Sequence, residues 1–234
     1  MFFLRKMIIN VKGLFPVKLK TFIKKFKKFN AYYQLDIKLL KYINFKNGFY
    51  IDCGANDGVN QSTTWYFEKY LNWNGILIEP IPNVFNELKK NRSKNNYFYN
   101  TALTNFNYNS KTIKFLFNKE DTLTSSIFSS DQFLKKTQTI EVKATTLDQI
   151  IKKNKSSKLI DLFSLDVEGY EFEVLNGINY DDTKFKFLLI ETEFPEKLIN
   201  FMSKKNYTFV ERLSNYNFSN KPAYGDYLFK GNFY

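Results

Sequence analysis

An apolar run that ends in a glycine-bracketed turn, residues 49–58, constrains this chain more than any other stretch. The run from Phe49 to Cys53 is apolar apart from Asp52, and Gly54 and Gly58 bracket the turn that follows. From residue 61 onward the spacing of apolar residues is typical of a helix. The stretch therefore predicts a strand over 49–53, a tight loop and a helix over 61–72, whose first N–H groups face a ligand.

A second apolar run ends in an acidic residue, Glu79, which lies 21 residues after Gly58. In a βαβ nucleotide site, an acidic residue at this distance accepts hydrogen bonds from the ribose hydroxyls. The two runs together therefore predict a site for a ligand that carries a ribose.

The rest of the chain alternates strand and helix patterns, which predicts an α/β fold with a Rossmann-like, mostly parallel sheet. We expect parallel strands over residues 49–53, 75–79, 97–100, 159–166 and 185–193, and a closing antiparallel pair over 208–211 and 225–229. Two segments of alternating polarity, 112–117 and 139–144, predict an inserted β-pair beside the cleft. The sum is a seven-stranded sheet with an insertion.

The turn favours one nucleotide ligand over the others. Asn56 stands where a dinucleotide-binding loop has its second glycine. This difference weakens the case for an NAD-dependent oxidoreductase. No Lys-Ser/Thr pair follows Gly58, which excludes a Walker loop. A ligand with a ribose but no phosphate fits better, and S-adenosylmethionine is such a ligand.

Composition limits the chemistry and the compartment. The 234 residues contain no histidine, so acid–base work falls to Asp, Glu, Lys, Tyr or a metal-bound water. The one cysteine, Cys53, excludes an internal disulfide and suits a reduced, cytoplasmic protein.

The net charge of +12 is concentrated at the N-terminus. Residues 1–30 hold nine Lys and Arg and no acidic residue, which leaves 26 basic and 23 acidic residues, a net +3, for 31–234. Apolar residues at helical spacing predict a basic amphipathic helix here. We expect a basic helical arm over 1–46 and a catalytic domain over 47–234.

The apolar stripe of this arm packs either on protein or, through residues 1–30, on the inner face of a membrane. No apolar run is long enough to span a membrane, and no segment is a convincing signal peptide.

Seven motifs occur in the order found in FkbM-type methyltransferases, which the chain resembles over about residues 32–230. They are GFYIDCGANDG (48–58), SxTxxFEK (62–69), GILIEPIP (75–82), NTAL (100–103), TTLDQII (145–151), IDLFSLDVEGYEFEVLNG (160–177) and IET (190–192). An imperfect lead-in, Gln34-x-Asp36, precedes them. The resemblance implies a class I methyltransferase fold, S-adenosylmethionine as donor, and O-methylation of a hydroxyl on a sugar, a glycan precursor or a secondary metabolite.

The loop, the second strand and the turn after the third strand supply the expected cofactor-binding residues. These are Asp52, Gly54, Asn56, Gly58, Glu79, Asn100 and Ala102.

Carboxylates at strand ends are the expected catalytic residues, because open α/β folds bind ligands at that edge of the sheet. In one mechanism a carboxylate, with Asp166 favoured, takes the proton of the acceptor hydroxyl. In the other, Asp166, Glu168 and Glu193 hold Mg²⁺ or Mn²⁺, which lowers the pKa of the hydroxyl. Alternatively these acidic residues only cap a helix or pair with lysines.

The acceptor is the least determined feature. We expect a sugar, a nucleotide sugar or a glycan, with a bacterial surface polysaccharide as the favoured source, and Gln34, Ser62 and Ser125 as candidates for its pocket. A nucleic-acid methyltransferase is disfavoured, because Asp166-Val167-Glu168-Gly169 replaces the Asn/Asp-Pro-Pro-aromatic loop of base methylation. A non-catalytic nucleotide- or glycan-binding module stays open, as does the oligomeric state.

Overall fold

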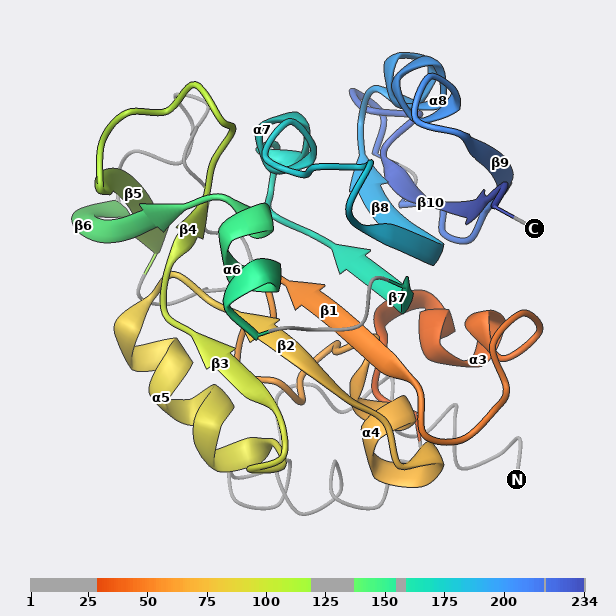
Figure 1. Cartoon of the computed structure of the whole chain (residues 1–234), viewed down its shortest axis with the longest axis horizontal. Helices are drawn as coiled ribbons and strands as arrows, with labels where there is room; N and C mark the ends of the chain where they lie inside the picture. The colour runs from red at the N-terminus through yellow and green to blue at the C-terminus, as the bar shows by residue number, and fades with distance from the viewer. Residues whose placement is uncertain (1–28, 119–136, 155–158, 217, 234) are drawn as a thin grey trace.

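A seven-stranded sheet forms the centre of the computed structural model, which describes residues 29–118, 137–154, 159–216 and 218–233 (Figure 1). Its strands are β1 (Phe49–Cys53), β2 (Asn74–Ile78), β3 (Tyr97–Tyr99), β7 (Leu159–Leu165), β8 (Lys184–Thr192), β9 (Tyr207–Arg212) and β10 (Gly225–Gly231). Their order across the sheet is β3-β2-β1-β7-β8-β10-β9. Every neighbouring pair from β3 to β8 is parallel, and β10 is antiparallel to both β8 and β9. The predicted seven-stranded, mostly parallel sheet is confirmed.

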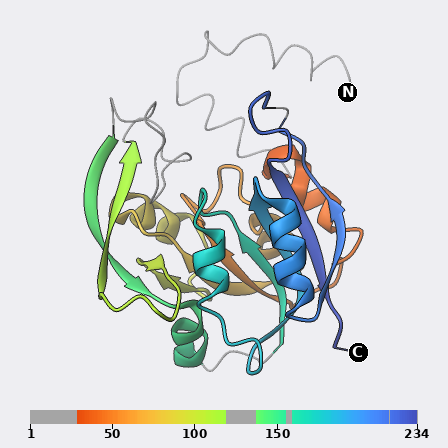
Figure 2. The same ribbon diagram turned by 90° about the horizontal axis from the view of Figure 1, so that it is seen from above.

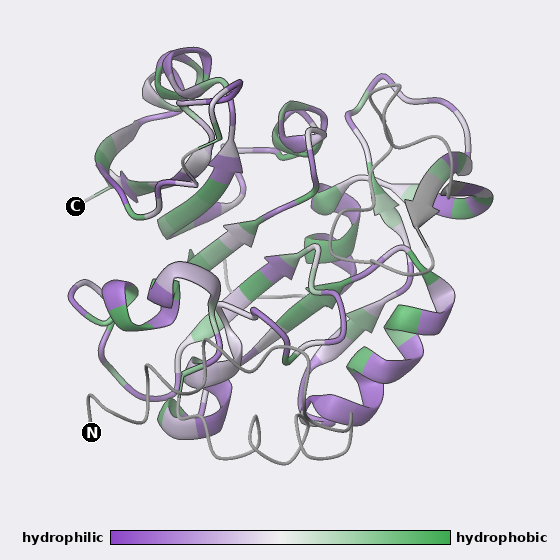
Figure 3. Ribbon diagram, turned by 180° about the vertical axis from the view of Figure 1, so that it is seen from behind, coloured by the Kyte–Doolittle hydropathy of each residue, from purple (hydrophilic) through white to green (hydrophobic). Residues whose placement is uncertain are grey.

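Helices cover both faces of this sheet, because the central strands are apolar on both sides. On one face, Leu39 of α3, Phe67 of α4 and Leu88 of α5 pack with Tyr50 and Leu77 of the sheet. On the other face, α6, α7 and α8 pack against strand residues that alternate with these. Figure 3 shows apolar residues along the central strands and hydrophilic residues along much of α5. The helices are α3 (Leu35–Leu39), α4 (Trp65–Leu71), α5 (Pro82–Asn91), α6 (Leu147–Asn154), α7 (Glu171–Leu175) and α8 (Pro195–Ser203).

The predicted inserted β-pair is part of a second, three-stranded sheet. β5 (Thr112–Asn118) runs antiparallel to β6 (Thr137–Thr145), and the two-residue strand β4 (Ala102–Leu103) pairs with the end of β6. Ile113, Phe115 and Val142 turn one face of this sheet toward Ile81 and Tyr170. The insertion therefore adds an apolar wall next to the ends of β2 and β7.

One helix prediction is wrong in its extent. The helix after the turn begins at Trp65 rather than at residue 61, since Gln61 has a positive φ of 58°, which does not fit a helix. Before β1, a 3₁₀ turn, η1 (Tyr32–Gln34), precedes the short α3, and Tyr33 and Gln34 have positive φ angles of 49° and 60° there.

The predicted basic arm is described only from residue 29 onward, and its proposed amphipathic helix lies outside the described residues. Within the described part, Leu35, Leu39 and Ile43 pack into the same core as Tyr50 and Leu77. No helix in this part of the chain is both long and apolar enough to cross a bilayer.

Candidate active site

The glycine-bracketed loop after β1 is held against the ends of two neighbouring strands. The N–H groups of Gly54 and Ala55 both donate to the carbonyl of Ile78 at 3.1 Å. Gly54 has a φ of +81°, and a Cβ at this position would lie 1.7 Å from the carbonyl oxygen of Asp166. Only glycine allows this approach, so the loop brings the end of β7 to the donor side of the site.

Glu79 fixes the loop from the end of β2. Its carboxylate accepts hydrogen bonds from the N–H groups of Asn56, at 3.1 Å, and Ile81, at 2.8 Å. The side chain is 4% exposed, and this burial raises the pKa of Glu79 to about 7. Asn56 has a positive φ of 46°, a conformation that asparagine tolerates better than most residues.

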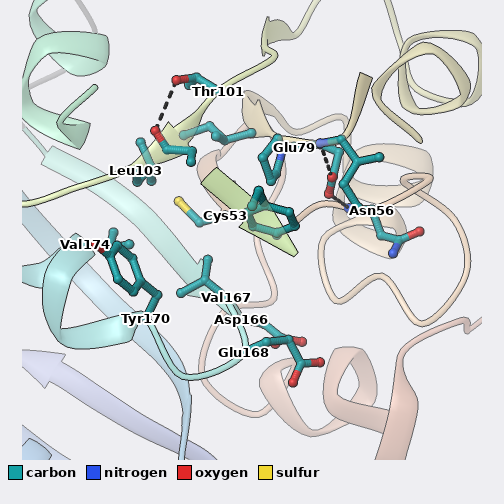
Figure 4. A pocket seen from close by; sticks show the side chains of 16 residues that line it. Cys53, Asn56, Glu79, Thr101, Leu103, Asp166, Val167, Glu168, Tyr170 and Val174 are labelled. Carbon is teal, nitrogen blue, oxygen red and sulfur yellow. Dashed lines mark hydrogen bonds between the residues drawn. The ribbon is translucent and has the colours of Figure 1, made fainter. Parts of the chain in front are cut away.

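A cavity of about 680 Å³, part of it open to solvent, lies between this loop, β4 and the end of β7. Glu79 and Asn56 line one end, and Asp166 and Glu168 lie at another (Figure 4). Apolar side chains, among them Ile81 and Phe115, cover the walls between them. Six of the predicted site residues line the cavity: Gly54, Asn56, Glu79, Ala102, Asp166 and Glu168.

Three predicted cofactor residues lie outside this lining and support it instead. Asp52 is buried on the other face of β1, where it accepts a 2.5 Å hydrogen bond from the hydroxyl of Thr64. Gly58 packs against α5 and Arg92. Asn100 donates from its amide to the carbonyls of Glu79 and Pro80, both at 2.9 Å, and so shapes the turn after β2. For Asp52, the alternation of side chains along a strand explains the difference, because Ile51 and Cys53 face the opposite core.

A buried arginine, Arg92, was not predicted and organises the back of the donor loop. Its guanidinium donates to Glu68 at 2.8 Å, to the hydroxyl of Tyr50 at 2.7 Å and to the carbonyl of Gly58 at 3.1 Å. The hydroxyls of Ser62 and Thr64 accept further bonds from it. Burial alone would raise the pKa of Glu68, but the charge of Arg92 and the hydrogen bonds to this carboxylate lower it. The polar residues of the motif SxTxxFEK are thus hydrogen-bond partners of Arg92, and Ser62 is one of these partners.

Three carboxylates meet at the other end of the cavity. One oxygen from each of Asp166, Glu168 and Glu191 lies within 4.8 Å of the other two; Asp166 is exposed to solvent, Glu168 is partly exposed and Glu191 is buried. The predicted third member, Glu193, instead forms a 2.9 Å ion pair with Lys221. The structure corrects this choice, because β8 ends at Thr192 and delivers Glu191 to the cluster.

The loop between β9 and β10 and the start of β10 extend this acidic cluster. Tyr224 donates a 2.5 Å hydrogen bond to Glu191, and Asp226 accepts bonds from Ser214, at 2.5 Å, and Tyr216, at 3.0 Å. From here on, Asp166, Glu168, Glu191 and Asp226 are called the acidic cluster. The contributions of Ser214, Tyr216, Tyr224 and Asp226 were not predicted. These residues lie far along the chain from the other members and belong to no recognised motif.

The acidic cluster holds protons more tightly than free carboxyl groups. Enclosure by protein atoms, followed by the negative charges of Glu191 and Glu168, raises the pKa of Asp166 well above its usual range. The same two causes, burial and the charge of Glu191, raise the pKa of Glu168 to about 8 and that of Asp226 to about 6. Carboxyl groups with such pKa values can take up a proton near neutral pH.

The backbone around Glu168 is strained. Glu168 has a φ of 54° and Gly169 a φ of +96°, and the N–H of Gly169 donates to the carboxylate of Glu171 at 2.8 Å. A non-glycine residue in this region costs of order 1–3 kcal/mol and is held there by its surroundings. Glu171 therefore stabilises, through its hydrogen bond with Gly169, the turn in which Glu168 faces the cavity.

The other residues considered for the acceptor pocket fall in different places. Gln34 is exposed at the end of the 3₁₀ turn, and Ser125 lies outside the described residues. Asp36 of the lead-in is buried and accepts hydrogen bonds from the N–H groups of Asn30, Ala31 and Ile37. The lead-in therefore stabilises a turn before α3.

The sheet order, with antiparallel β10 between β8 and β9 and a cavity at the ends of the parallel strands, defines a class I methyltransferase fold. The methyltransferase FkbM domain model matches residues 52–217, and the chain belongs to this family. The family is one of methyltransferases, and it implies S-adenosylmethionine as donor. The cavity fits this donor: Glu79 offers a buried acceptor for ribose hydroxyls, and Ile81, Ala102 and Phe115 offer apolar surface for the adenine.

Several solved methyltransferases resemble the structure. The methyltransferase FkbM from Methylobacillus flagellatus KT is 13% identical with a TM-score of 0.50, and the match covers 81% of this chain and 45% of that one. This chain therefore spans less than half the length of that relative. TYW2 from M. jannaschii, in complex with AdoMet, is 14% identical (TM-score 0.39; 85% and 77% covered), and a putative rRNA methylase from Clostridium thermocellum is 10% identical (TM-score 0.44; 86% and 95% covered). A search of curated proteins found no significant match.

Proposed function

We propose that the protein is an S-adenosylmethionine-dependent O-methyltransferase that acts on a hydroxyl of a sugar, nucleotide sugar or glycan precursor, with bacterial surface polysaccharide as the favoured source. The observation that carries the proposal is the acidic cluster at one end of the donor cavity. Asp166 and Glu168 line the same cavity as Glu79, and the chain has no histidine that could serve as a base. Hydroxyl acceptors need such a proton acceptor, because an alcohol is a poor nucleophile.

The residues divide the work between the two ends of the cavity. When bound, S-adenosylmethionine supplies a methyl group that leaves its sulfur as an acceptor oxygen attacks. Glu79 and the loop over 54–58 hold the donor side. Asp166, the solvent-exposed member of the acidic cluster, accepts the proton of the acceptor hydroxyl, and desolvation of its carboxyl group, followed by the charges of Glu191 and Glu168, raises its affinity for that proton. Tyr224 positions Glu191 through its hydrogen bond.

The same charges disfavour a nucleic-acid substrate. Asp166 and Glu168 line the cavity where the acceptor would enter, and their ionised carboxylates repel phosphates. The strong basic charge of the chain lies in residues 1–30, whereas 31–234 carry only a net +3.

Substitution of Asp166 tests the function. In a full-length chain supplied with labelled S-adenosylmethionine and a panel of nucleotide sugars, we expect transfer that rises with pH toward about 8, because the coupled carboxylates must lose a proton. Asp166→Asn should lower kcat by roughly 10²–10⁴-fold and leave donor affinity by calorimetry within about threefold. The control is Asp181→Asn, at an exposed position away from the cavity. Full activity of Asp166→Asn would remove this carboxylate as the base, and absence of donor binding to the parent chain would overturn the whole proposal.

A divalent cation is the second candidate for activating the hydroxyl, and one observation favours it. Asp166, Glu168 and Glu191 each offer an oxygen within 4.8 Å of the others, and all-oxygen sites suit Mg²⁺ or Mn²⁺. The members differ from the predicted set by Glu191 in place of Glu193.

Chelation separates the two mechanisms. If a cation acts, excess EDTA should abolish transfer, and added Mg²⁺ or Mn²⁺ should restore it. Glu191→Gln should then weaken Mn²⁺ binding by calorimetry, whereas Glu193→Gln, whose carboxylate pairs with Lys221, should not. Undiminished turnover after exhaustive chelation would leave the direct carboxylate mechanism.

A further inference from the structure

Five aromatic side chains gather beside the acidic cluster, and the donor site does not use them. Ring centroids lie 5.0 Å apart for Tyr33 and Tyr216, 5.1 Å for Tyr216 and Tyr224, and 5.7 Å for Phe218 and Tyr224. Tyr216 and Phe218 stack with 12° between their planes, and Tyr32 contacts Tyr216 at 5.8 Å. Tyr32, Tyr33, Tyr216, Phe218 and Tyr224 are called the aromatic cluster below.

The aromatic cluster joins two segments that are far apart in sequence. Figure 2 shows the loop between β9 and β10 next to the segment that contains α3. The rings of Tyr32 and Tyr33 come from one segment, and the other three come from the loop. Such packing between separate segments fixes the ring positions, which favours a binding surface over a mobile loop.

Hydrogen bonds attach the inner rings to the acidic cluster. Tyr224 donates to Glu191 at 2.5 Å, and Tyr216 donates to Asp226 at 3.0 Å. Glu191 in turn lies within 4.8 Å of Asp166 and Glu168, which line the donor cavity. A continuous set of contacts therefore leads from the cavity to the aromatic cluster.

The outer rings are open to solvent. Phe218 is 47% exposed and Tyr32 is 48% exposed. Phe218 has no polar group that would explain its exposure. An exposed apolar ring in a packed group, next to polar side chains, is typical of a ligand-binding surface.

Aromatic faces next to carboxyl groups suit a ligand that is apolar on one face and rich in hydroxyls at its edge. A sugar ring has this character, since its C–H groups cover one face and its hydroxyls project outward. The base of a nucleotide would also stack, but the phosphates of that nucleotide would be repelled by the ionised carboxylates of Asp166 and Glu168, which line the cavity. Two described cations lie near the acidic cluster: Lys221 is paired with Glu193, and Lys38 donates to the carbonyl of Leu213.

We propose that the aromatic cluster is the acceptor subsite, where Phe218 and its stacked neighbour Tyr216 hold an uncharged sugar ring whose hydroxyl points toward Asp166 and Glu168. The proposal rests on the proposed function and narrows its substrate class to sugar units without a phosphate or carboxylate on the methylated ring. Phe218 is a specificity residue in this scheme, and Tyr224 is a positioning residue.

A glycan array tests the subsite without requiring turnover. The full chain, preloaded with S-adenosylhomocysteine, is applied to immobilised bacterial glycans that include neutral, amino-sugar, uronic-acid and phosphorylated units. We expect binding to neutral units, weakened roughly three- to tenfold by Phe218→Ala, the loss expected for one aromatic stacking contact. Phe218→Trp, which keeps an aromatic face, should restore binding. Phe106→Ala is the control, because Phe106 is 52% exposed but belongs to neither cluster.

The outcomes separate this proposal from the proposed function. Equal binding by Phe218→Ala and the parent, binding only to uronic-acid or phosphorylated units, or no glycan binding by a chain that binds S-adenosylhomocysteine would each overturn the subsite. In all three cases methyl transfer to another acceptor would still leave the methyltransferase function standing. Failure to bind S-adenosylhomocysteine in calorimetry would instead count against both.

Discussion

At the scale of single residues, Glu79 links the stability of the fold to pH. Its carboxylate is buried and accepts two backbone hydrogen bonds, and burial raises its pKa from 4.5 to about 7. Between these two values the folded protein binds a proton that the unfolded chain has released. The free energy of unfolding therefore falls as pH rises through this window, by up to about 3 kcal/mol from this group.

Glu79→Gln should remove this pH dependence. We expect the parent to lose stability relative to Glu79→Gln as the pH rises from about 5 to 7.5, because the glutamine side chain has no proton to lose. Urea denaturation at a series of pH values measures the difference. Glu87→Gln is the matched control, since the side chain of Glu87 is 56% exposed on α5. Parallel stability curves for the parent and Glu79→Gln would contradict the assignment.

At the scale of elements, α4 and α5 are joined to the donor loop by one cation. Arg92 follows α5, Glu68 lies in α4, and the carbonyl of Gly58 belongs to the loop. The side chain of Arg92 is 0% exposed, so its removal would leave the carboxylate of Glu68 without its ion-pair partner. The motif that contains Ser62, Thr64 and Glu68 is thus a structural support for the donor site.

Arg92→Met should destabilise the fold by about 3–5 kcal/mol, the usual effect of removing one partner of a buried ion pair. Lys90→Met, which removes an exposed pair with Glu87, should cost at most about 1 kcal/mol. Denaturation with urea compares the two variants. The double variant Arg92→Met/Glu68→Gln should recover part of the loss, because it no longer buries an unpaired charge. A loss below about 1 kcal/mol for Arg92→Met would show that solvent reaches this network.

At the scale of the whole molecule, the sequence predicts the sheet well and the far side of the site poorly. Alternating apolar runs and short loops determine the parallel strands, and the distance from Gly58 to Glu79 identifies the donor half. The acidic cluster depends on where β8 ends and on what β10 brings beside it, so Glu191 rather than Glu193 is its member. No local sequence pattern identifies Asp226 and Tyr224, because only the long-range pairing of β10 with β8 brings them next to the cluster.

The position of β10 has a consequence for how the molecule folds. β10 follows β9 in sequence but lies between β8 and β9, so the edge of β8 stays unpaired until residues 225–231 arrive. That edge includes the apolar residues Leu188, Leu189 and Ile190, and exposed edges of this kind invite pairing with other chains. The same strand brings Asp226, so a chain that has not yet inserted β10 has its acidic cluster incomplete. Insertion of one strand both removes a route to aggregation and completes the acidic cluster.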